Sequence, residues 1–282
     1  MIPSKFEYYS PASLGEALAL LSQYQDDAKV LAGGQSLISL LKLRLASPKC
    51  LVDLGRIGDL SYIREDGNSI SIGAMTTYAL IAESKLIQEK CPLLRQTALV
   101  VGDVQVRNRG TLGGSLGHAD PAGDMPAAIL ALRGNLKAAG QAERWIKADD
   151  FFLGMYSTAL APDEILTEVQ VPVLKDRHSA YLKAARRPSD FAIVGIAVCL
   201  KRGKDGTCED ISLGVTGVTD KPYRPRNVEA ALQGKNLEPK TIEAAAQGIA
   251  EGLDVNGNIH ASPEFRAHLA GVYLGRAIQS AS

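Results

Sequence analysis

The sequence predicts an α+β protein with a larger N-terminal region of two subdomains and a smaller C-terminal α+β domain with an antiparallel sheet. Helical and β-like segments are mixed over residues 1–174. The order of segments then changes, because three successive β-like segments come before the last helices. Val173 to Arg177 is the best boundary, so we expect domains over residues 1–174 and 175–282.

The first subdomain is expected to cover about residues 1–54. Ser13 and Glu16 have the spacing of a capping box, which predicts that a helix begins at this point. The expected elements are a helix, a strand, a helix and a strand, over residues 13–24, 28–32, 36–44 and 50–54.

The second subdomain is expected to cover about residues 55–174. Asp66-Gly67-Asn68 separates two β-like segments and predicts a hairpin, while Pro126 suits the first turn of a helix. The other expected strands lie at 135–139, 143–146 and 165–171. The expected helices run from Thr76 or Thr77 to residue 81, from 92 to 101 and from 124 to 132, the last one stopped by Gly134.

The C-terminal domain is expected to hold three β-like segments and three helices. The segments lie at residues 179–185, 192–201 and 211–218, and the helices at 229–232, 241–252 and 263–279. We find no internal repeat and no low-complexity tract in the sequence.

The charge balance limits the classes of partner. Lysine and arginine together number 31, as do aspartate and glutamate, so no basic field favours nucleic acid. The N-terminal stretch lacks the apolar region of a signal peptide, and no uninterrupted apolar run approaches the length of a membrane span. We therefore expect a cytoplasmic protein with neither a nucleic-acid partner nor a membrane span.

The four cysteines are scattered along the chain. No pair has the Cys-x-x-Cys spacing, and no histidine lies near them at metal-ligand spacing. This pattern argues against iron–sulfur ligation by this chain and against a disulfide framework. We expect no metal ligands in it.

Two glycine-pair segments are the main candidates for ligand binding: residues 32–37, with the sequence AGGQSL, and residues 111–116, with the sequence TLGGSL. Neither is a P-loop or a Rossmann fingerprint. Either pair alone is more commonly a turn or a close-packing position. Together with Asp124 they predict one phosphate-containing ligand, bound by backbone N–H groups and hydroxyls between two subdomains.

Catalytic candidates are few. His118 is the only histidine close to a glycine segment, and we interpret it as structural or as a neighbour of the ligand. Asp120 and Asp124 could be paired carboxylates, but Asp124 is more simply a helix N-cap whose carboxylate a ligand hydroxyl could share. No nucleophile elbow or histidine–glutamate metal motif is present. The pattern indicates a cofactor-binding chain without catalytic residues of its own.

Several spaced motifs, in order, resemble the FAD-binding medium subunit of molybdenum hydroxylases, the carbon monoxide dehydrogenase and xanthine dehydrogenase family. They lie at residues 32–38, 73–77, 105–116, 118–126 and 164–166. The resemblance covers nearly the whole chain. It implies an FAD-binding region of the PCMH, or vanillyl-alcohol-oxidase, type followed by the C-terminal domain of that family.

The resemblance also implies a set of FAD-binding residues. They are Lys29, Ala32, Gly33, Gly34, Gln35, Ser36, Leu37, Val101, Gly110, Thr111, Gly113, Gly114, Ser115, His118, Asp120, Asp124, Leu166, Lys183 and Phe191. Leu166, Lys183 and Phe191 match positions near the isoalloxazine ring, where a lysine would stabilise negative charge on the reduced ring. For Lys29, contact with the phosphates or adenine and simple solvation are equally good interpretations.

Three positions depart from the pattern of the family. Gln35 stands where relatives often have histidine, and Ser115 where asparagine is common; both keep hydrogen-bonding ability. Phe191 stands where some relatives have tyrosine, so a hydroxyl near the flavin is lost.

The function implied by the resemblance is electron transfer. FAD in this chain would receive electrons from two [2Fe–2S] clusters of a small subunit, and a large molybdopterin subunit would oxidise the substrate. An external acceptor would take the electrons, and the complex would be a dimer of heterotrimers. The alternatives are a self-contained flavin oxidase or dehydrogenase, for which no base is evident beside the ring, and a nucleotide-sensing interaction module.

Overall fold

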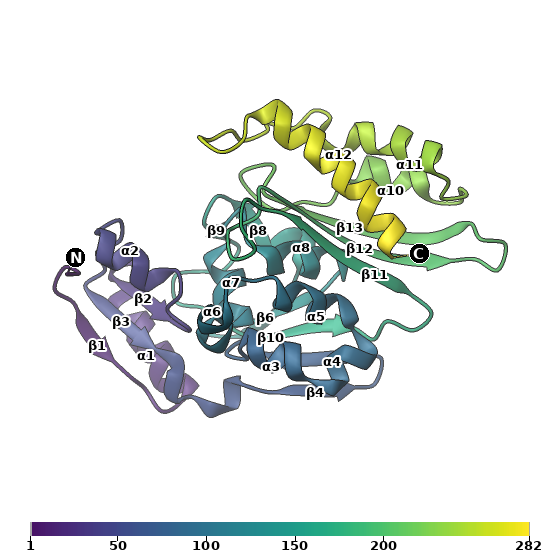
Figure 1. Cartoon of the computed structure of the whole chain (residues 1–282). Coiled ribbons are helices and arrows are strands. Elements are labelled where there is room, and N and C mark those ends of the chain that lie inside the picture. Colours follow the sequence, from purple (N-terminus) through teal and green to yellow (C-terminus); the bar gives the residue numbers. More distant parts are fainter. Residues whose placement is uncertain (1, 282) are drawn as a thin grey trace.

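The computed structural model describes residues 2–281 and divides into three parts along the chain (Figure 1). A small N-terminal part lies to one side of a central five-stranded sheet with its helices. A three-stranded sheet with the last helices lies above the central part. The predicted α+β class, with a C-terminal antiparallel sheet, is confirmed.

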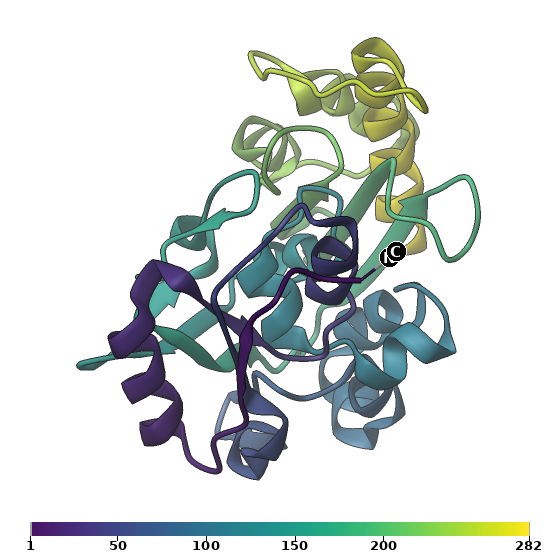
Figure 2. The same ribbon diagram turned by 90° about the vertical axis from the view of Figure 1, so that its left-hand side faces the viewer.

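The N-terminal part is a parallel three-stranded sheet in the order β1-β3-β2, seen in front in Figure 2. Ser13 caps its first helix by accepting a hydrogen bond from the N–H of Glu16, as the predicted capping box implies; the Glu16 carboxylate accepts from the N–H of Ala12, one residue before the N-cap. The elements are β1 (Glu7–Tyr9), α1 (Leu14–Tyr24), β2 (Ala28–Leu31), α2 (Leu37–Leu43) and β3 (Cys50–Asp53), with short 3₁₀ turns at Gln25–Asp27, Leu54–Arg56 and Gly58–Leu60.

The central sheet is antiparallel throughout, in the order β4-β5-β10-β6-β7. Its strands are β4 (Ile63–Asp66), β5 (Ser69–Gly73), β6 (Asn135–Ala139), β7 (Glu143–Lys147) and β10 (Ile165–Pro172). The Asp66-to-Ser69 hairpin therefore forms where the sequence predicts it, with Gly67 at a positive φ of 60°.

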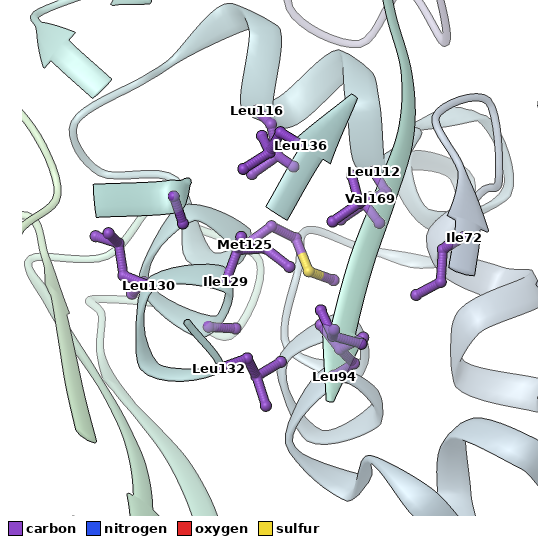
Figure 3. Close-up of a cluster of buried hydrophobic side chains, with 14 of the residues drawn as sticks. Ile72, Leu94, Leu112, Leu116, Met125, Ile129, Leu130, Leu132, Leu136 and Val169 are labelled. Carbon is purple, nitrogen blue, oxygen red and sulfur yellow. The ribbon is translucent and has the colours of Figure 1, made fainter. Parts of the chain in front are cut away.

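The helices that cover this sheet come between β5 and β6 in the sequence. They are α3 (Tyr78–Glu83), α4 (Lys85–Lys90), α5 (Pro92–Leu99), α6 (Val104–Arg109), α7 (Leu112–His118) and α8 (Asp124–Ala131), and the short α9 (Ala148–Phe151) follows β7. Figure 3 shows that Met125 and Ile129 of α8 pack against Leu112 and Leu116 of α7, inside a core that also takes Val169 of β10. This core fixes the first turn of α7 against the sheet.

Four of these helices, α4, α6, α7 and α9, were not predicted from the sequence. Each has only four to seven residues, so the apolar spacing of a helix hardly repeats in it. Helix α5 ends at Leu99, two residues before the predicted end. Helix α8 is followed by Arg133, with a positive φ of 52°, so the predicted stop at Gly134 lies one residue too late.

The C-terminal sheet is antiparallel in the order β11-β12-β13, with most of its large apolar side chains on one face against the last helices. Its strands are β11 (His178–Ala184), β12 (Val194–Arg202) and β13 (Cys208–Thr216). The helices are α10 (Arg226–Leu232), α11 (Pro239–Ala246), a 3₁₀ turn at Gln247–Ala250 and α12 (Pro263–Ser280), and a small hairpin, β8 (Phe152–Gly154) with β9 (Ser157–Thr158), precedes β10.

The opposite face of the C-terminal sheet packs on α5 and α8 through small and polar side chains. Gly214 of β13 lies so close to α8 that a Cβ there would overlap the carbonyl oxygen of Ala127. The absence of a side chain at this position therefore allows sheet and helix to meet at backbone distance.

We predict that Gly214→Ala lowers the free energy of unfolding by about 1–3 kcal/mol, because α8 or β13 must shift to admit the methyl group. Gly15→Ala in α1, where a Cβ would meet nothing within 4 Å, is the matched control and should be neutral or slightly stabilising. Chemical denaturation of the two variants measures the difference, and equal stabilities would refute the packing argument.

Candidate functional site

The structure brings the two glycine segments into direct contact. A Cβ at Gly33 would overlap the carbonyl oxygen of Arg109, and a Cβ at Gly114 would lie 3.2 Å from that of Ala32. Segments about 80 residues apart in the sequence therefore meet where the N-terminal part joins the central part. At each of these contacts the glycine has no Cβ, so the neighbouring segment can come close to its backbone.

The first segment is the loop between β2 and α2, and it presents free backbone donors. Within residues 2–281, the N–H groups of Gly33, Gly34, Gln35 and Ser36 donate to no acceptor. Gly34 has a positive φ of 75°, which turns successive N–H groups toward one side of the loop. Ser36 is the N-cap of α2, yet its hydroxyl makes no capping hydrogen bond. The loop can therefore bind an anion through backbone and hydroxyl donors.

The second segment was predicted to be a loop, but it forms the first turn of α7. Its amides already have protein partners: Leu112 donates to Thr76 O at 3.0 Å, Gly113 to Ala74 O at 2.8 Å and Gly114 to Thr111 Oγ1 at 3.1 Å. The expectation that backbone N–H groups of Thr111 to Ser115 bind the ligand therefore does not hold for Gly113 and Gly114, whose N–H groups donate to protein acceptors. Thr111 caps the helix, which the sequence pattern did not reveal because the apolar spacing is too short.

Gly113 and Gly110 serve packing at this turn. A Cβ at Gly113 would overlap Ala74, and one at Gly110 would lie 2.6 Å from the ring of Tyr78. Burial raises the pKa of the Tyr78 hydroxyl to about 12, against the opposing influence of the Ser115 side chain. This turn therefore supports the first glycine loop, which it contacts through Gly114 and Ala32.

Asp124 is the first residue of α8, and the prediction that it is the N-cap is wrong, because Gly123 holds that position. Its carboxylate instead accepts hydrogen bonds from the Tyr181 hydroxyl at 2.6 Å and from Lys183 Nζ at 2.9 Å. Lys183 also donates to the carbonyl of Val100 at 3.1 Å. The side chains of this ion pair are about 5–6% exposed, so both charges are buried.

The buried ion pair shifts the ionisation of its members. Burial raises the pKa of Asp124, although the charge of Lys183 and the hydrogen bond from Tyr181 oppose that shift. Burial, the charge of Asp124 and the hydrogen bond to it raise the pKa of Tyr181 well above its usual value. Tyr181 was not among the predicted site residues, although it shares a strand face with Lys183 at i, i+2 spacing.

His118 and Asp120 lie at the end of α7, where each has a structural partner. The His118 ring lies 4.9 Å, centroid to centroid, from that of Tyr156, and Tyr156 donates its N–H to Ala119 O at 3.2 Å. Asp120 Oδ1 accepts from the N–H of Ala122 at 2.9 Å, and its Oδ2 accepts from the Tyr156 hydroxyl at 3.5 Å. Asp120 and Asp124 thus have separate partners, and they do not form a shared carboxylate pair.

The remaining predicted residues lie in different environments. Lys29 is exposed on β2, Leu37 is the half-buried first residue of α2, and Val101 is half-buried just after α5. Leu166 of β10 is buried in the central core, whereas Phe191, between β11 and β12, is 63% exposed.

Within residues 2–281 there is no group of three or more His, Cys, Asp or Glu side chains that could hold a metal ion. All four cysteines are buried and unpaired. No helix in this range has the length and apolarity that crossing a bilayer requires.

Comparison with protein-family models assigns a class to this fold and site. Residues 4–174 match the model described as the FAD binding domain in molybdopterin dehydrogenase. Residues 179–281 match the CO dehydrogenase flavoprotein C-terminal domain. The chain belongs to this family of FAD-binding flavoprotein subunits of molybdopterin-dependent dehydrogenases.

Individual relatives are similar over the whole chain. The carbon monoxide dehydrogenase medium chains of Hydrogenophaga pseudoflava and Afipia carboxidovorans are 37% and 39% identical, over 100% of this chain and 98% of each relative. The glyceraldehyde dehydrogenase medium chain of Sulfolobus acidocaldarius is 36% identical over 99% of both chains.

Solved structures show the same fold. A chain of the carbon monoxide dehydrogenase of Hydrogenophaga pseudoflava superposes with a TM-score of 0.97 at 39% identity, covering 100% of this chain and 98% of that one. A chain of quinoline 2-oxidoreductase from Pseudomonas putida 86 gives 0.94 at 34% identity, with coverages of 100% and 98%. The predicted resemblance and the predicted FAD cofactor are thereby confirmed.

The residues present fit FAD. Four successive backbone N–H groups of residues 33–36 lack acceptors within the described chain, and a pyrophosphate supplies several acceptor oxygens. The Ser36 hydroxyl is likewise not used for capping. The same loop rests on the glycine turn of α7, so its shape is fixed by the protein rather than by the ligand.

We predict that Gly113→Ala lowers the free energy of unfolding by about 1–3 kcal/mol and lowers the flavin content, because a methyl group there would push α7 away from Ala74. Gly117→Ala, in the same helix but with nothing within 4 Å of its Cβ, should change neither quantity. Denaturation curves and flavin absorbance of both variants measure the effect. Equal behaviour of the two variants would contradict the assigned packing role.

A second prediction concerns the pH dependence of stability. Burial lowers the pKa of His118 below its usual 6.5, although the charge of Asp120 opposes the shift, so the folded protein binds this proton less readily than the unfolded chain does. Stability is then lost as the pH falls from 6.5 through the folded pKa. We expect His118→Gln to lose less stability than the wild type between pH 7 and pH 5, while both behave alike above pH 7.5. A proton NMR titration that places the His118 pKa above 6.5 would refute this.

Proposed function

We propose that this chain is the FAD-carrying electron-transfer subunit of a molybdenum hydroxylase complex. It would pass electrons from [2Fe–2S] clusters of a partner subunit to an external acceptor. The observation that carries the proposal is the loop of free N–H donors at residues 33–36, in a chain that matches flavoprotein subunits over its whole length.

We propose domains at residues 1–174, with subdomains of about 1–54 and 55–174, and at residues 175–282. The apolar cores support this division. One core lies between α1 and the N-terminal sheet, one between the central sheet and its helices, and one between the C-terminal sheet and α10–α12. Only isolated residues of one part, such as Ile165 and Tyr181, enter the core of another.

Bound FAD supplies two-electron redox chemistry that the side chains themselves lack. Ala32 to Leu37 would bind the pyrophosphate through N–H groups and the Ser36 hydroxyl, and Lys29 would contact phosphate or adenine. Gly110, Thr111 and Gly113–Ser115 would position that loop. The other predicted contacts, which rest on the family resemblance, are Val101, His118, Asp120, Asp124, Leu166, Lys183 and Phe191.

The Asp124–Lys183 ion pair changes what the lysine would do. A lone lysine near the flavin would stabilise negative charge on the reduced ring, but the Asp124 carboxylate, 2.9 Å away, balances that charge. We therefore propose that Lys183 acts mainly by holding Asp124 and the end of α5 in place. Its long-range electrostatic effect would be smaller than that of an unpaired lysine.

The proposed partners are a small iron–sulfur subunit and a large molybdopterin subunit, assembled as a dimer of heterotrimers in the cytoplasm. The relatives that support this are named as parts of complexes, such as the nicotine 6-hydroxylase medium subunit of Paenarthrobacter nicotinovorans and the caffeine dehydrogenase subunit beta of a Pseudomonas strain. The two names refer to different substrates, although the two relatives are 38% and 33% identical to this chain. The substrate would therefore be chosen by another subunit.

The proposal predicts a specific effect of Ser36→Ala. Loss of a hydroxyl that bonds a phosphate oxygen should weaken FAD binding about tenfold or more, since hydrogen bonds to charged groups are strong. Stability should change little, because this hydroxyl does not cap α2. The complex is purified with its accompanying subunits, and FAD is quantified by absorbance after release and titrated back.

Ser13→Ala is the matched control, because Ser13 caps α1 with its hydroxyl and lies outside the proposed site. It should cost about 1 kcal/mol of stability and leave FAD affinity unchanged. Unchanged FAD affinity in the Ser36 variant would overturn the assigned loop. Absence of flavin from the intact complex, or turnover of an organic substrate by this chain alone, would overturn the proposed function.

A further inference from the structure

A cavity lies between the central part and the C-terminal sheet, and no residue of the two glycine segments lines it. It has a volume of about 350 Å³ and is partly open to solvent. Its walls come from the β4–β5 turn, the segment after α8, the end of β10, and strands β12 and β13. None of the residues proposed to bind FAD lines it, so it is separate from the flavin site.

The cavity has an excess of positive charge. Arg133 and Arg177 both line it, and both donate to the one carboxylate of Asp210, at 2.6 Å and 2.7 Å. One carboxylate cannot balance two guanidinium groups, so one positive charge remains at the wall of the cavity. Burial would favour the neutral acid, but the two arginines outweigh it and lower the pKa of Asp210, which therefore stays ionised at neutral pH.

Arg133 occupies a backbone position that normally favours glycine. It follows α8 with a positive φ of 52°, and it donates to Ile211 O at 3.3 Å as well as to Asp210. A glycine would take this left-handed position without strain, and Gly134 is the next residue. The Arg133 side chain is thus kept at a backbone position that costs conformational energy, and its guanidinium group donates to Asp210 and to Ile211 O.

The cavity also contains an unsatisfied hydroxyl. Ser212 of β13 is 1% exposed and lines the cavity, yet its Oγ atom has no hydrogen-bond partner. Buried polar groups are nearly always paired, so an unpaired one beside a cavity indicates a missing partner. Leu132, Val171 and Leu174 add apolar side chains to the lining of the cavity.

We propose that this cavity binds a small organic carboxylate. Its carboxylate would accept hydrogen bonds from the guanidinium group of Arg177 and the hydroxyl of Ser212, and would balance the excess charge. Its hydrocarbon part would contact these apolar side chains, which an inorganic anion would leave uncovered. Because the walls come from both the central part and the C-terminal sheet, binding would stabilise their contact.

The test uses the full-length chain in its purified complex and a series of straight-chain monocarboxylates from acetate to pentanoate. We expect binding by calorimetry and a rise in melting temperature with carboxylate concentration. Affinity should increase along the series as more hydrocarbon is buried. 1-Butanol and butylamine, which lack the carboxylate, should have no such effect, and sulfate should bind more weakly than butanoate.

Ser212→Ala should weaken butanoate binding about tenfold without lowering stability, because the wild-type hydroxyl has no partner to lose. Ser179→Ala is the matched control, since its hydroxyl is also unpaired on the C-terminal sheet but does not line the cavity. Absence of binding at millimolar carboxylate would show that the cavity holds only water and overturn the proposal. Equal loss in both serine variants, or sulfate binding as tight as butanoate, would overturn it as well.

Discussion

Close backbone contact at three glycines is the constraint on which the arrangement of this chain depends. Gly33 joins the N-terminal part to the central part, Gly113 fits α7 against Ala74, and Gly214 brings the C-terminal sheet onto α8. At each position a single methyl group would overlap a neighbouring residue. These contacts fix the position of the free backbone N–H groups in the first glycine loop, because the loop packs on α7 and α7 packs on the central core.

The buried Asp124–Lys183 pair links that core to the C-terminal domain. Removing two charges from water is costly, and the cost is offset only when hydrogen bonds complete the pair, as Tyr181 and the Val100 carbonyl do here. Strand β11 therefore supplies polar groups to the helices of the preceding domain. The C-terminal domain thereby acts on the proposed flavin site without taking part in the glycine loop.

The fold class, most strands and the family could be predicted from the sequence, because these rest on long patterns and on several motifs in a fixed order. The features that tertiary contacts decide could not. The second glycine pair became a helical turn because Thr111 caps it, and Asp124 turned away from its expected capping role toward two residues nearly 60 positions later. The sequence near Asp124 does not indicate partners so distant along the chain. Tyr181 was missed for the same reason, although its alternation with Lys183 on one strand face was visible.

The two faces of the C-terminal sheet have different consequences for how this protein can change. One face builds an apolar core with α10–α12 that lies within the domain itself. That other face carries small and polar residues such as Tyr181, Cys199 and Ser212. Substitutions on that face act mainly on the contact with the flavin-binding part, as Gly214 shows, rather than on the core with α10–α12. One scaffold can therefore acquire different contacts with the flavin-binding part while keeping its own shape.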